Sequence, residues 1–177
     1  GKSIENELIK RKIGKSINQI SKDTTFKPEI CNLENILDGC ILALKFRFRD
    51  KVELKRRYNA NHKTILGNTG KLHQAILNIL NNAVDAFENE GQITVETESN
   101  DAFIEIKVKD NGCGISKENL QKVTDPFFTT KDQEGVSGLG LSIAKSIIEE
   151  HSGELSLTSK LGVGTTVCIK LPQDFKI

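Results

Sequence analysis

The sequence has no tryptophan and no methionine, and only one tyrosine and three prolines in 177 residues. Aromatic residues make up 5% of the chain, so any core must be built mainly from aliphatic side chains. The 25 basic and 24 acidic residues nearly cancel, which gives no electrostatic reason to expect a polyanionic or membrane partner. No apolar run approaches the roughly 18 residues of a membrane span, and no signal peptide opens the chain. We expect a fragment of a longer protein, because no methionine opens the sequence.

Cysteine is scarce and scattered. Cys31, Cys40, Cys113 and Cys168 form no C-x-x-C pair. This spacing argues against a zinc site and favours a reduced, cytoplasmic setting. The length suits one domain with its own core and a short appendage.

Hydrophobic periodicity predicts helices and pairs of short strands. The expected helices cover residues 3–21, 33–44, 70–90, 117–123 and 141–151. The expected strands cover residues 52–59, 64–66, 92–98, 103–109, 153–159 and 165–171. The segment at 22–29 contains a proline and resembles a linker. Helices grouped with antiparallel-type strands favour an α+β fold, a two-layer α/β sandwich with helices on one face of a mixed, mostly antiparallel sheet.

The segment NILNNAVDAF (78–87) places three asparagines in a predicted helix, where asparagine is unfavourable. On a helical wheel, Gln74, Asn78, Asn81, Asn82 and Asp85 form one polar stripe about 100° wide. A solvated stripe would favour Glu and Lys, which are better helix formers. Amides beside one carboxylate suit a partly enclosed site with oxygen ligands for Mg²⁺ and phosphates. A buried polar network between helix and sheet is the alternative.

Two glycine-rich segments flank predicted elements. DNGCGI (110–115) follows a strand, and GVSGLGLS (135–142) leads into a helix. Glycine lets backbone N–H groups approach an anion, and a helix N-terminus adds a positive dipole end. Neither segment forms a G-x-x-x-x-G-K-[ST] or a full G-x-G-x-x-G motif. Each alone is also compatible with an ordinary turn.

Five motifs in a fixed order resemble the ATP-binding catalytic domain of sensor histidine kinases. They are HQAILNILNNAVDA (73–86), DNGCGI (110–115), DPFFTTK (125–131), GLGLS (138–142) and GVGTT (162–166). The superfamily also includes type II topoisomerase, mismatch-repair and heat-shock chaperone ATPases, and the resemblance covers about residues 33–173. It implies a Bergerat-type ATP-binding fold for residues 25–177, with residues 1–24 as the end of a dimerisation helix and its linker.

The resemblance also implies roles for individual residues. Asn82 would ligate Mg²⁺, with Asn78 beside the metal and phosphates, while Asp85 stays outside the metal shell. Asp110 would accept a hydrogen bond from the adenine amino group, where guanine would present a mismatched carbonyl. Lys131 would contact phosphate and, with Asn78, take part in catalysis. The other implied nucleotide contacts are Gly112, Gly114, Ile115, Phe128, Thr129, Thr130, Gly138, Leu139, Gly140, Leu141 and Thr166.

The residue type at position 78 distinguishes the kinases of this superfamily from its hydrolases. The hydrolases of the superfamily generally carry a glutamate at this position as general base, and an amide cannot take a proton. A kinase needs no such base, because its nucleophile comes from the partner histidine. His62, His73 and His151 lack the acceptor pattern, and the last two have the spacing of helix-surface residues. We therefore expect ATP-dependent transfer of a phosphoryl group to a histidine outside this fragment.

The implied partners are the dimerisation and phosphoacceptor domain of the same protein and a response regulator. The full-length protein would be a homodimer. This part of it would lie in the cytoplasm, even if another part anchors the protein in a membrane. The basic run KFRFRDKVELKRR (45–57) suggests nucleic-acid binding, but a solvated helix end and strand explain it better, so we expect no nucleic-acid partner. We also expect no membrane contact by this fragment. Alternatives are a hydrolytic ATPase module, a kinase for serine on an anti-sigma-type partner, and a nucleotide-sensing scaffold.

Overall fold

The structure is a computed structural model that describes residues 27–49, 51–125 and 140–173. Its elements in chain order are β1 (Glu29–Asn32), α2 (Leu33–Ala43), α3 (Lys45–Phe48), β2 (Val52–Tyr58), β3 (Thr64–Gly67), α4 (Thr69–Asp85), β4 (Gly91–Ser99), β5 (Phe103–Asp110), α5 (Lys117–Leu120), α6 (Gly140–Glu150), β6 (Glu154–Lys160) and β7 (Gly164–Pro172). The predicted helix at 3–21 lies outside the described residues.

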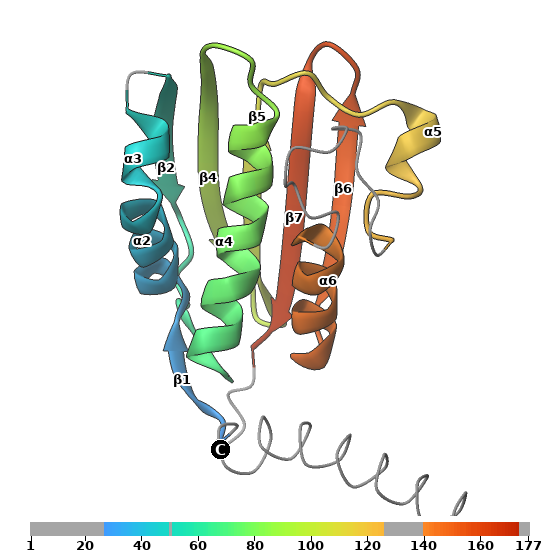
Figure 1. Ribbon diagram of the computed structural model, residues 1–177. Coiled ribbons are helices and arrows are strands. Elements are labelled where there is room, and N and C mark those ends of the chain that lie inside the picture. The colour runs from blue at the N-terminus through green and yellow to red at the C-terminus, as the bar shows by residue number, and fades with distance from the viewer. Residues whose placement is uncertain (1–26, 50, 126–139, 174–177) are drawn as a thin grey trace, which may run out of the picture.

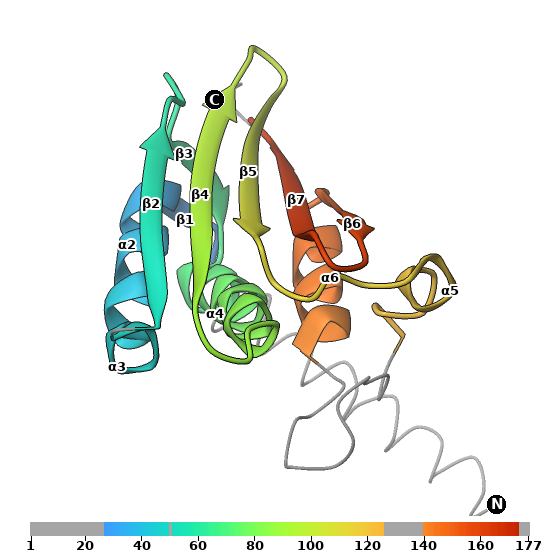
Figure 2. The same ribbon diagram turned by 90° about the horizontal axis from the view of Figure 1, so that it is seen from above.

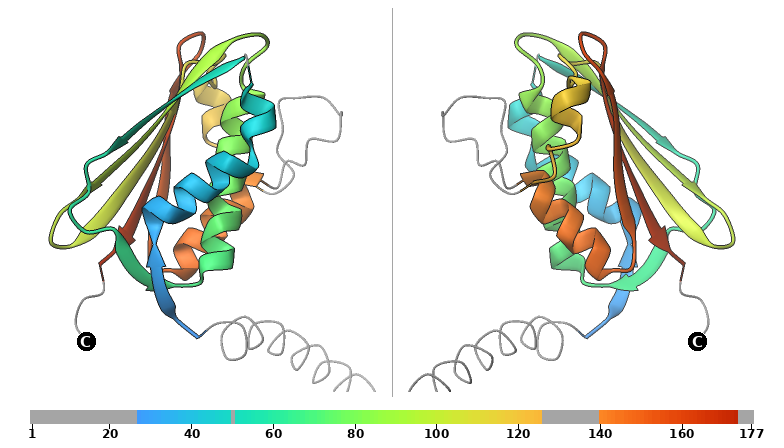
Figure 3. Two further views of the ribbon diagram at one scale, coloured as in Figure 1. Left: turned by 90° about the vertical axis from the view of Figure 1, so that its left-hand side faces the viewer. Right: turned by 90° about the vertical axis from the view of Figure 1, so that its right-hand side faces the viewer.

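A five-stranded sheet with the order β2-β4-β5-β7-β6 forms one layer of the domain (Figure 1). Strands β2 and β4 are parallel, and the remaining neighbours are antiparallel. Figure 3 shows helices α2, α4 and α6 covering one face of this sheet. Strands β1 and β3 form a separate antiparallel pair. The predicted two-layer sandwich with a mixed, mostly antiparallel sheet is therefore confirmed.

The core lies between the helices and the sheet and is almost entirely aliphatic. Alternate residues of β4, β5 and β7 point into it, as the period of two in a strand requires. Its largest fully buried side chains are Leu33, Leu37, Leu72, Ile76, Ile79, Leu80, Ile93, Ile104, Ile106, Ile148, Ile169 and Leu171.

Charged residues fill the sheet face that points away from the helices. Glu96 on β4 lies 3.7 Å from Arg57 and 3.2 Å from Lys109 on the neighbouring strands. Glu105 on β5 pairs with Lys107 at 3.1 Å and with Lys170 at 3.9 Å. Arg57, the last residue of the basic run, therefore belongs to a row of paired charges on this sheet face.

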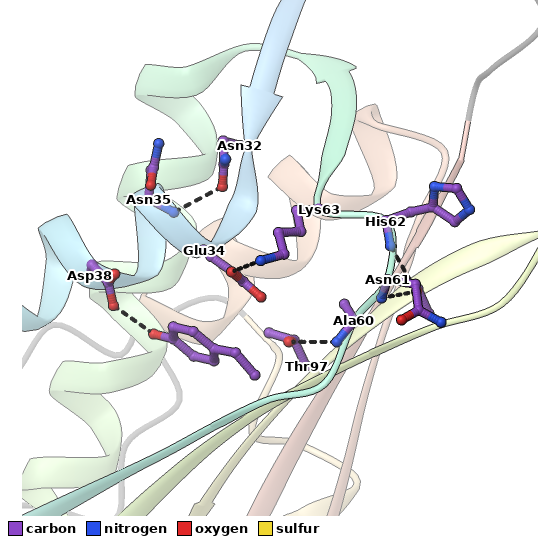
Figure 4. Close-up of polar contacts among 11 residues, drawn as sticks. Asn32, Glu34, Asn35, Asp38, Ala60, Asn61, His62, Lys63 and Thr97 are labelled. Atoms are coloured by element: carbon purple, nitrogen blue, oxygen red, sulfur yellow. Dashed lines mark hydrogen bonds and ion pairs between the residues drawn. The ribbon is translucent and has the colours of Figure 1, made fainter.

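Helix α2 is fixed at its start and on its flank by polar contacts (Figure 4). The Asn32 side chain caps it by accepting a hydrogen bond from the Asn35 N–H at 3.1 Å. Three residues after Asn35, Asp38 accepts a hydrogen bond from the Tyr58 hydroxyl at 2.8 Å, which ties the helix to β2. Burial, with this carboxylate as a second cause, raises the pKa of Tyr58. The hydroxyl therefore stays protonated and keeps its role as donor.

Helix α4 begins with a side-chain cap and ends earlier than its sequence pattern predicts. Asn68 accepts a hydrogen bond from the Lys71 N–H at 3.0 Å. The helix ends at Asp85, five residues before the predicted end at 90. The Phe87 ring packs so closely over Gly91 that a Cβ there would lie 2.0 Å from it. Phe87 therefore lies in the turn after the helix, with its ring against the first residue of β4.

His151 is a core residue, contrary to its predicted place on a helix surface. Only 9% of its surface is exposed. Its Nδ1 lies 2.7 Å from the Ile147 carbonyl, and its Nε2 accepts a hydrogen bond from the Asn68 N–H at 3.0 Å. The ring therefore joins the end of α6 to the residue that caps α4.

Replacing Gly67 with alanine should destabilise the fold at this junction. The new Cβ would lie 2.6 Å from His151 Cδ2 and 2.8 Å from Nε2, so the ring would have to leave its hydrogen bonds. We expect Gly67→Ala to lower the free energy of unfolding by about 2 kcal/mol in urea denaturation. Gly39→Ala is the matched control, because its nearest neighbour is 3.6 Å away and alanine favours a helix. Equal stability of the two variants would contradict the prediction.

Candidate nucleotide site

Asp110 lies at the end of β5, where the strand leads into the first glycine loop. Its Oδ1 accepts a hydrogen bond from the Gly112 N–H at 2.9 Å. Burial raises the pKa of Asp110, while backbone N–H groups of Gly112 and Thr165 oppose that rise. A half-buried carboxylate with one side held by the backbone can accept a further hydrogen bond from a ligand amino group.

The glycines of this loop allow two chain segments to pack against each other. Gly112 faces Ala86, at the end of α4, where a Cβ would lie 2.6 Å from the alanine methyl. Gly114 has φ +73°, and a Cβ there would lie 2.1 Å from the Lys160 carbonyl. Figure 2 shows this segment leaving β5 and passing the β6–β7 turn toward α5. Side chains at either position would push the loop away from α4 or from the turn.

In the last predicted motif, GVGTT (162–166), the threonine beside Asp110 is one residue earlier than predicted. Strand pairing sets Thr165 opposite Asp110 and Thr166 opposite Lys109, on the charged face of the sheet. Thr165 is buried, and its hydroxyl lies 2.7 Å from the Ser159 hydroxyl. A shift of one residue turns a strand side chain to the other face, so Thr165 replaces Thr166 beside Asp110. The parity of buried Val167, Ile169 and Leu171 is the sequence signal that identifies it.

Ile115 lies where the glycine loop meets β6. Its N–H donates to the Ser159 hydroxyl at 2.7 Å, and the same hydroxyl donates to the Gly164 carbonyl at 2.9 Å. Its side chain is half-buried and packs against the core. The residues from Asp110 to Ile115 therefore form one connected wall with the β6–β7 hairpin.

The amide helix contacts the second glycine segment directly. Asn78 Nδ2 donates to the Gly140 carbonyl at 3.3 Å. Gly140 is the first residue of α6, and a Cβ there would meet no atom of the described residues within 4 Å. Within the part of the chain that the structure describes, only the α4 amide of Asn78 is recorded against this helix end.

The polar stripe of α4 is divided between two surroundings, where the sequence predicts one. Asn82 is exposed, one turn beyond Asn78 on the same side of the helix. Asn81 and Asp85 instead bind Arg47 of α3, with Arg47 Nη2 donating to Asp85 Oδ1 at 2.6 Å. The arginine was not predicted, because no local pattern links it to a helix 34 residues away. Asn81 and Asp85 thus belong to a polar network with α3, where the alternative expected one with the sheet, and the metal and phosphate roles of Asn78 and Asn82 stay predictions.

The remaining predicted contacts fall into two groups. Leu141 is buried in the core, so its side chain supports α6 and only its backbone is available to a ligand. The others lie outside the described residues and stay predictions: Phe128, Thr129, Thr130, Lys131, Gly138 and Leu139.

The donor set of α4 suits a magnesium ion that arrives with phosphate. Over the described residues, no group of three His, Cys, Asp or Glu side chains could hold a metal by itself. Asn78 and Asn82 offer neutral oxygen ligands, and Mg²⁺ completes its shell with phosphates and waters. The residues present therefore fit a nucleotide-bound ion better than a permanent metal centre.

Comparison with known proteins identifies the family. The sequence model of the histidine kinase-, DNA gyrase B- and HSP90-like ATPases matches residues 67–174, more than half of the chain. The chain belongs to this family of ATP-binding domains. Among curated proteins, the chain is similar to parts of a sensor protein and of a sporulation kinase.

A putative sensor protein of Shewanella frigidimarina is 42% identical over 104 residues, which cover 58% of this chain and 16% of that protein. Sporulation kinase B of Bacillus subtilis is 39% identical over 111 residues, or 62% of this chain and 26% of the kinase. The chain thus spans about a quarter or less of these curated relatives. Histidine kinase ThkA, solved in complex with response regulator TrrA, shares the fold with a TM-score of 0.72 at 24% identity, covering 97% of this chain and 49% of that one.

Proposed function

We propose that this chain binds ATP with Mg²⁺ and transfers the γ-phosphoryl group to a histidine on another domain of its parent protein. The contact between Asn78 and the Gly140 carbonyl carries this proposal, because it joins the amide helix to the helix end predicted to hold phosphates. Asp110 would accept a hydrogen bond from the adenine amino group at the other end of the site. The first turn of α6 would offer backbone N–H groups to the phosphates.

The amide at position 78 favours transfer over hydrolysis. Asn78 cannot accept a proton from water, so the usual agent of hydrolysis in this superfamily is missing. When bound, Mg²⁺ would neutralise charge on the phosphate oxygens. Asn82 and Asn78 would orient that ion, and Lys131 would supply a positive charge to the transferred group.

The domain arrangement of the parent is part of the same proposal. Residues 1–24 would continue a dimerisation helix and linker, and residues 25–177 would form the catalytic domain. The partners would be the phosphoacceptor domain of a homodimer and a response regulator, the partner class seen with ThkA.

Every helix of the described ranges falls short of what a membrane span requires. Four free thiols are consistent with a reducing, cytoplasmic location.

A calorimetric titration of the chain with ATP and Mg²⁺ tests this function. We expect binding heats that return to a flat baseline, because the acceptor histidine lies outside the fragment. A sustained heat drift that scales with protein concentration would mean hydrolysis and would favour the ATPase alternative. If no binding heat appears at two temperatures, the result would favour a scaffold domain that no longer binds nucleotide.

Replacing Asn82 with alanine should remove the metal dependence of ATP binding. We expect wild-type affinity to fall about tenfold when EDTA replaces Mg²⁺, and the affinity of Asn82→Ala to be the same in both buffers. Gln74→Ala is the matched control, since Gln74 is an exposed polar residue of the same helix two turns earlier. A tenfold metal effect that persists in Asn82→Ala would exclude this residue as the ligand.

A further inference from the structure

Arg47 connects α3 to the polar side of α4. It donates to both Asn81 and Asp85, and its distance to the Asp85 carboxylate is 2.6 Å. The two charged side chains are 31% and 25% exposed, so water screens this pair less than an open surface pair. No other ion pair within the described residues connects α3 to α4.

The carboxylate that Arg47 holds is a neighbour of the proposed metal ligands. Asp85 lies three residues after Asn82 and seven after Asn78, which are spacings that share one helix face. A carboxylate is a stronger ligand for a hard divalent cation than a neutral amide. Its negative charge would also repel a triphosphate bound along the same face.

We propose that Arg47 is a positioning residue that keeps Asp85 out of the metal shell and neutralises it beside the phosphates. The divalent ion is then held by amides and by the nucleotide, so it binds with ATP and leaves with the product. This inference rests on the proposed function of Asn78 and Asn82. It also explains why a carboxylate is tolerated on a face that must accept an anion.

Removal of the arginine should create a metal site that the wild-type protein lacks. In Arg47→Ala, the Asp85 carboxylate loses the guanidinium contact and can offer a charged oxygen on the helix face that it shares with Asn82. We expect Mn²⁺, used as a spectroscopic probe without nucleotide, to bind at least about tenfold more tightly than to wild type. ATP in EDTA should bind about tenfold more weakly, because the carboxylate is no longer neutralised.

The double variant Arg47→Ala/Asp85→Asn separates this role from general support of the fold. It should return both Mn²⁺ and ATP binding to wild-type values, because the carboxylate is gone. A purely structural arginine would not show such a gain of metal binding or its reversal. Arg56→Ala is the matched control, since Arg56 forms a 3.6 Å ion pair with Asp38 on another part of the domain. It should leave both measurements unchanged.

The experiment uses the full chain, with Mn²⁺ binding followed by electron paramagnetic resonance and ATP binding by calorimetry. Circular dichroism confirms folding, and Arg47→Gln replaces Arg47→Ala if the latter does not fold. Wild-type Mn²⁺ affinity in a folded Arg47 variant would overturn the inference, as would a gain that persists in the double variant. Failure of the wild-type chain to bind ATP would instead overturn the proposed function, because the Mn²⁺ titration contains no nucleotide.

Discussion

Asp110→Asn should abolish ATP binding while leaving the fold intact. The Asn amide oxygen can still accept the Gly112 N–H, which the carboxylate binds at 2.9 Å. The amide nitrogen then faces the proposed position of the adenine amino group, so two donors oppose each other. An unsatisfied buried donor costs about 3 kcal/mol, which corresponds to roughly a hundredfold loss of affinity. Calorimetry with ATP measures the loss directly.

Asp101→Asn provides the control for this variant. Asp101 is an exposed turn residue between β4 and β5, at the end of β5 away from Asp110. It should bind ATP as the wild type does, and both variants should unfold at the wild-type temperature. A normal ATP affinity in Asp110→Asn would exclude this residue as the reader of the adenine amino group.

Elements with strong local periodicity are the ones that sequence reasoning found. The β4–β5 and β6–β7 hairpins combine alternating strands with short turns, so neighbouring residues determine the pairing. Strand β1 was not predicted, and the predicted linker at 22–29 includes only its first residue, because its partner β3 lies some thirty residues away and four residues carry little pattern. Helix α3 has four residues, fewer than a periodic signal requires.

The candidate site was predictable in its motifs and less so in its side-chain detail. The contact between Asn78 and Gly140 joins two predicted boxes that are 62 residues apart. Arg47 of α3 binds Asn81 and Asp85, so a contact distant in sequence decides which residues of the polar stripe remain for a ligand. The choice of Thr165 over Thr166 depends on strand register, a property of the pairing rather than of one strand.

Gly164→Ala should be the most damaging single-methyl change near the site. Gly164 has φ +144°, and a Cβ there would lie 2.0 Å from the Asp110 carbonyl oxygen. The clash is with backbone, so either β7 or the end of β5 must move, and Asp110 moves with it. We expect a loss of about 3 kcal/mol in the free energy of unfolding and weaker ATP binding.

Gly162→Ala isolates the part of this effect that comes from backbone conformation alone. Gly162 also has a positive φ, +78°, but a Cβ there would meet no atom within 4 Å among the residues that the structure describes. It should therefore lose only about 1 kcal/mol, the strain of a left-handed alanine, and bind ATP normally. Urea denaturation of the two variants compares them directly. If Gly164→Ala lost no more stability than Gly162→Ala, the β6–β7 turn would not be what holds the end of β5. Loss of ATP binding in Gly164→Ala alone would instead mean that the nucleotide site depends on this close contact between β7 and Asp110.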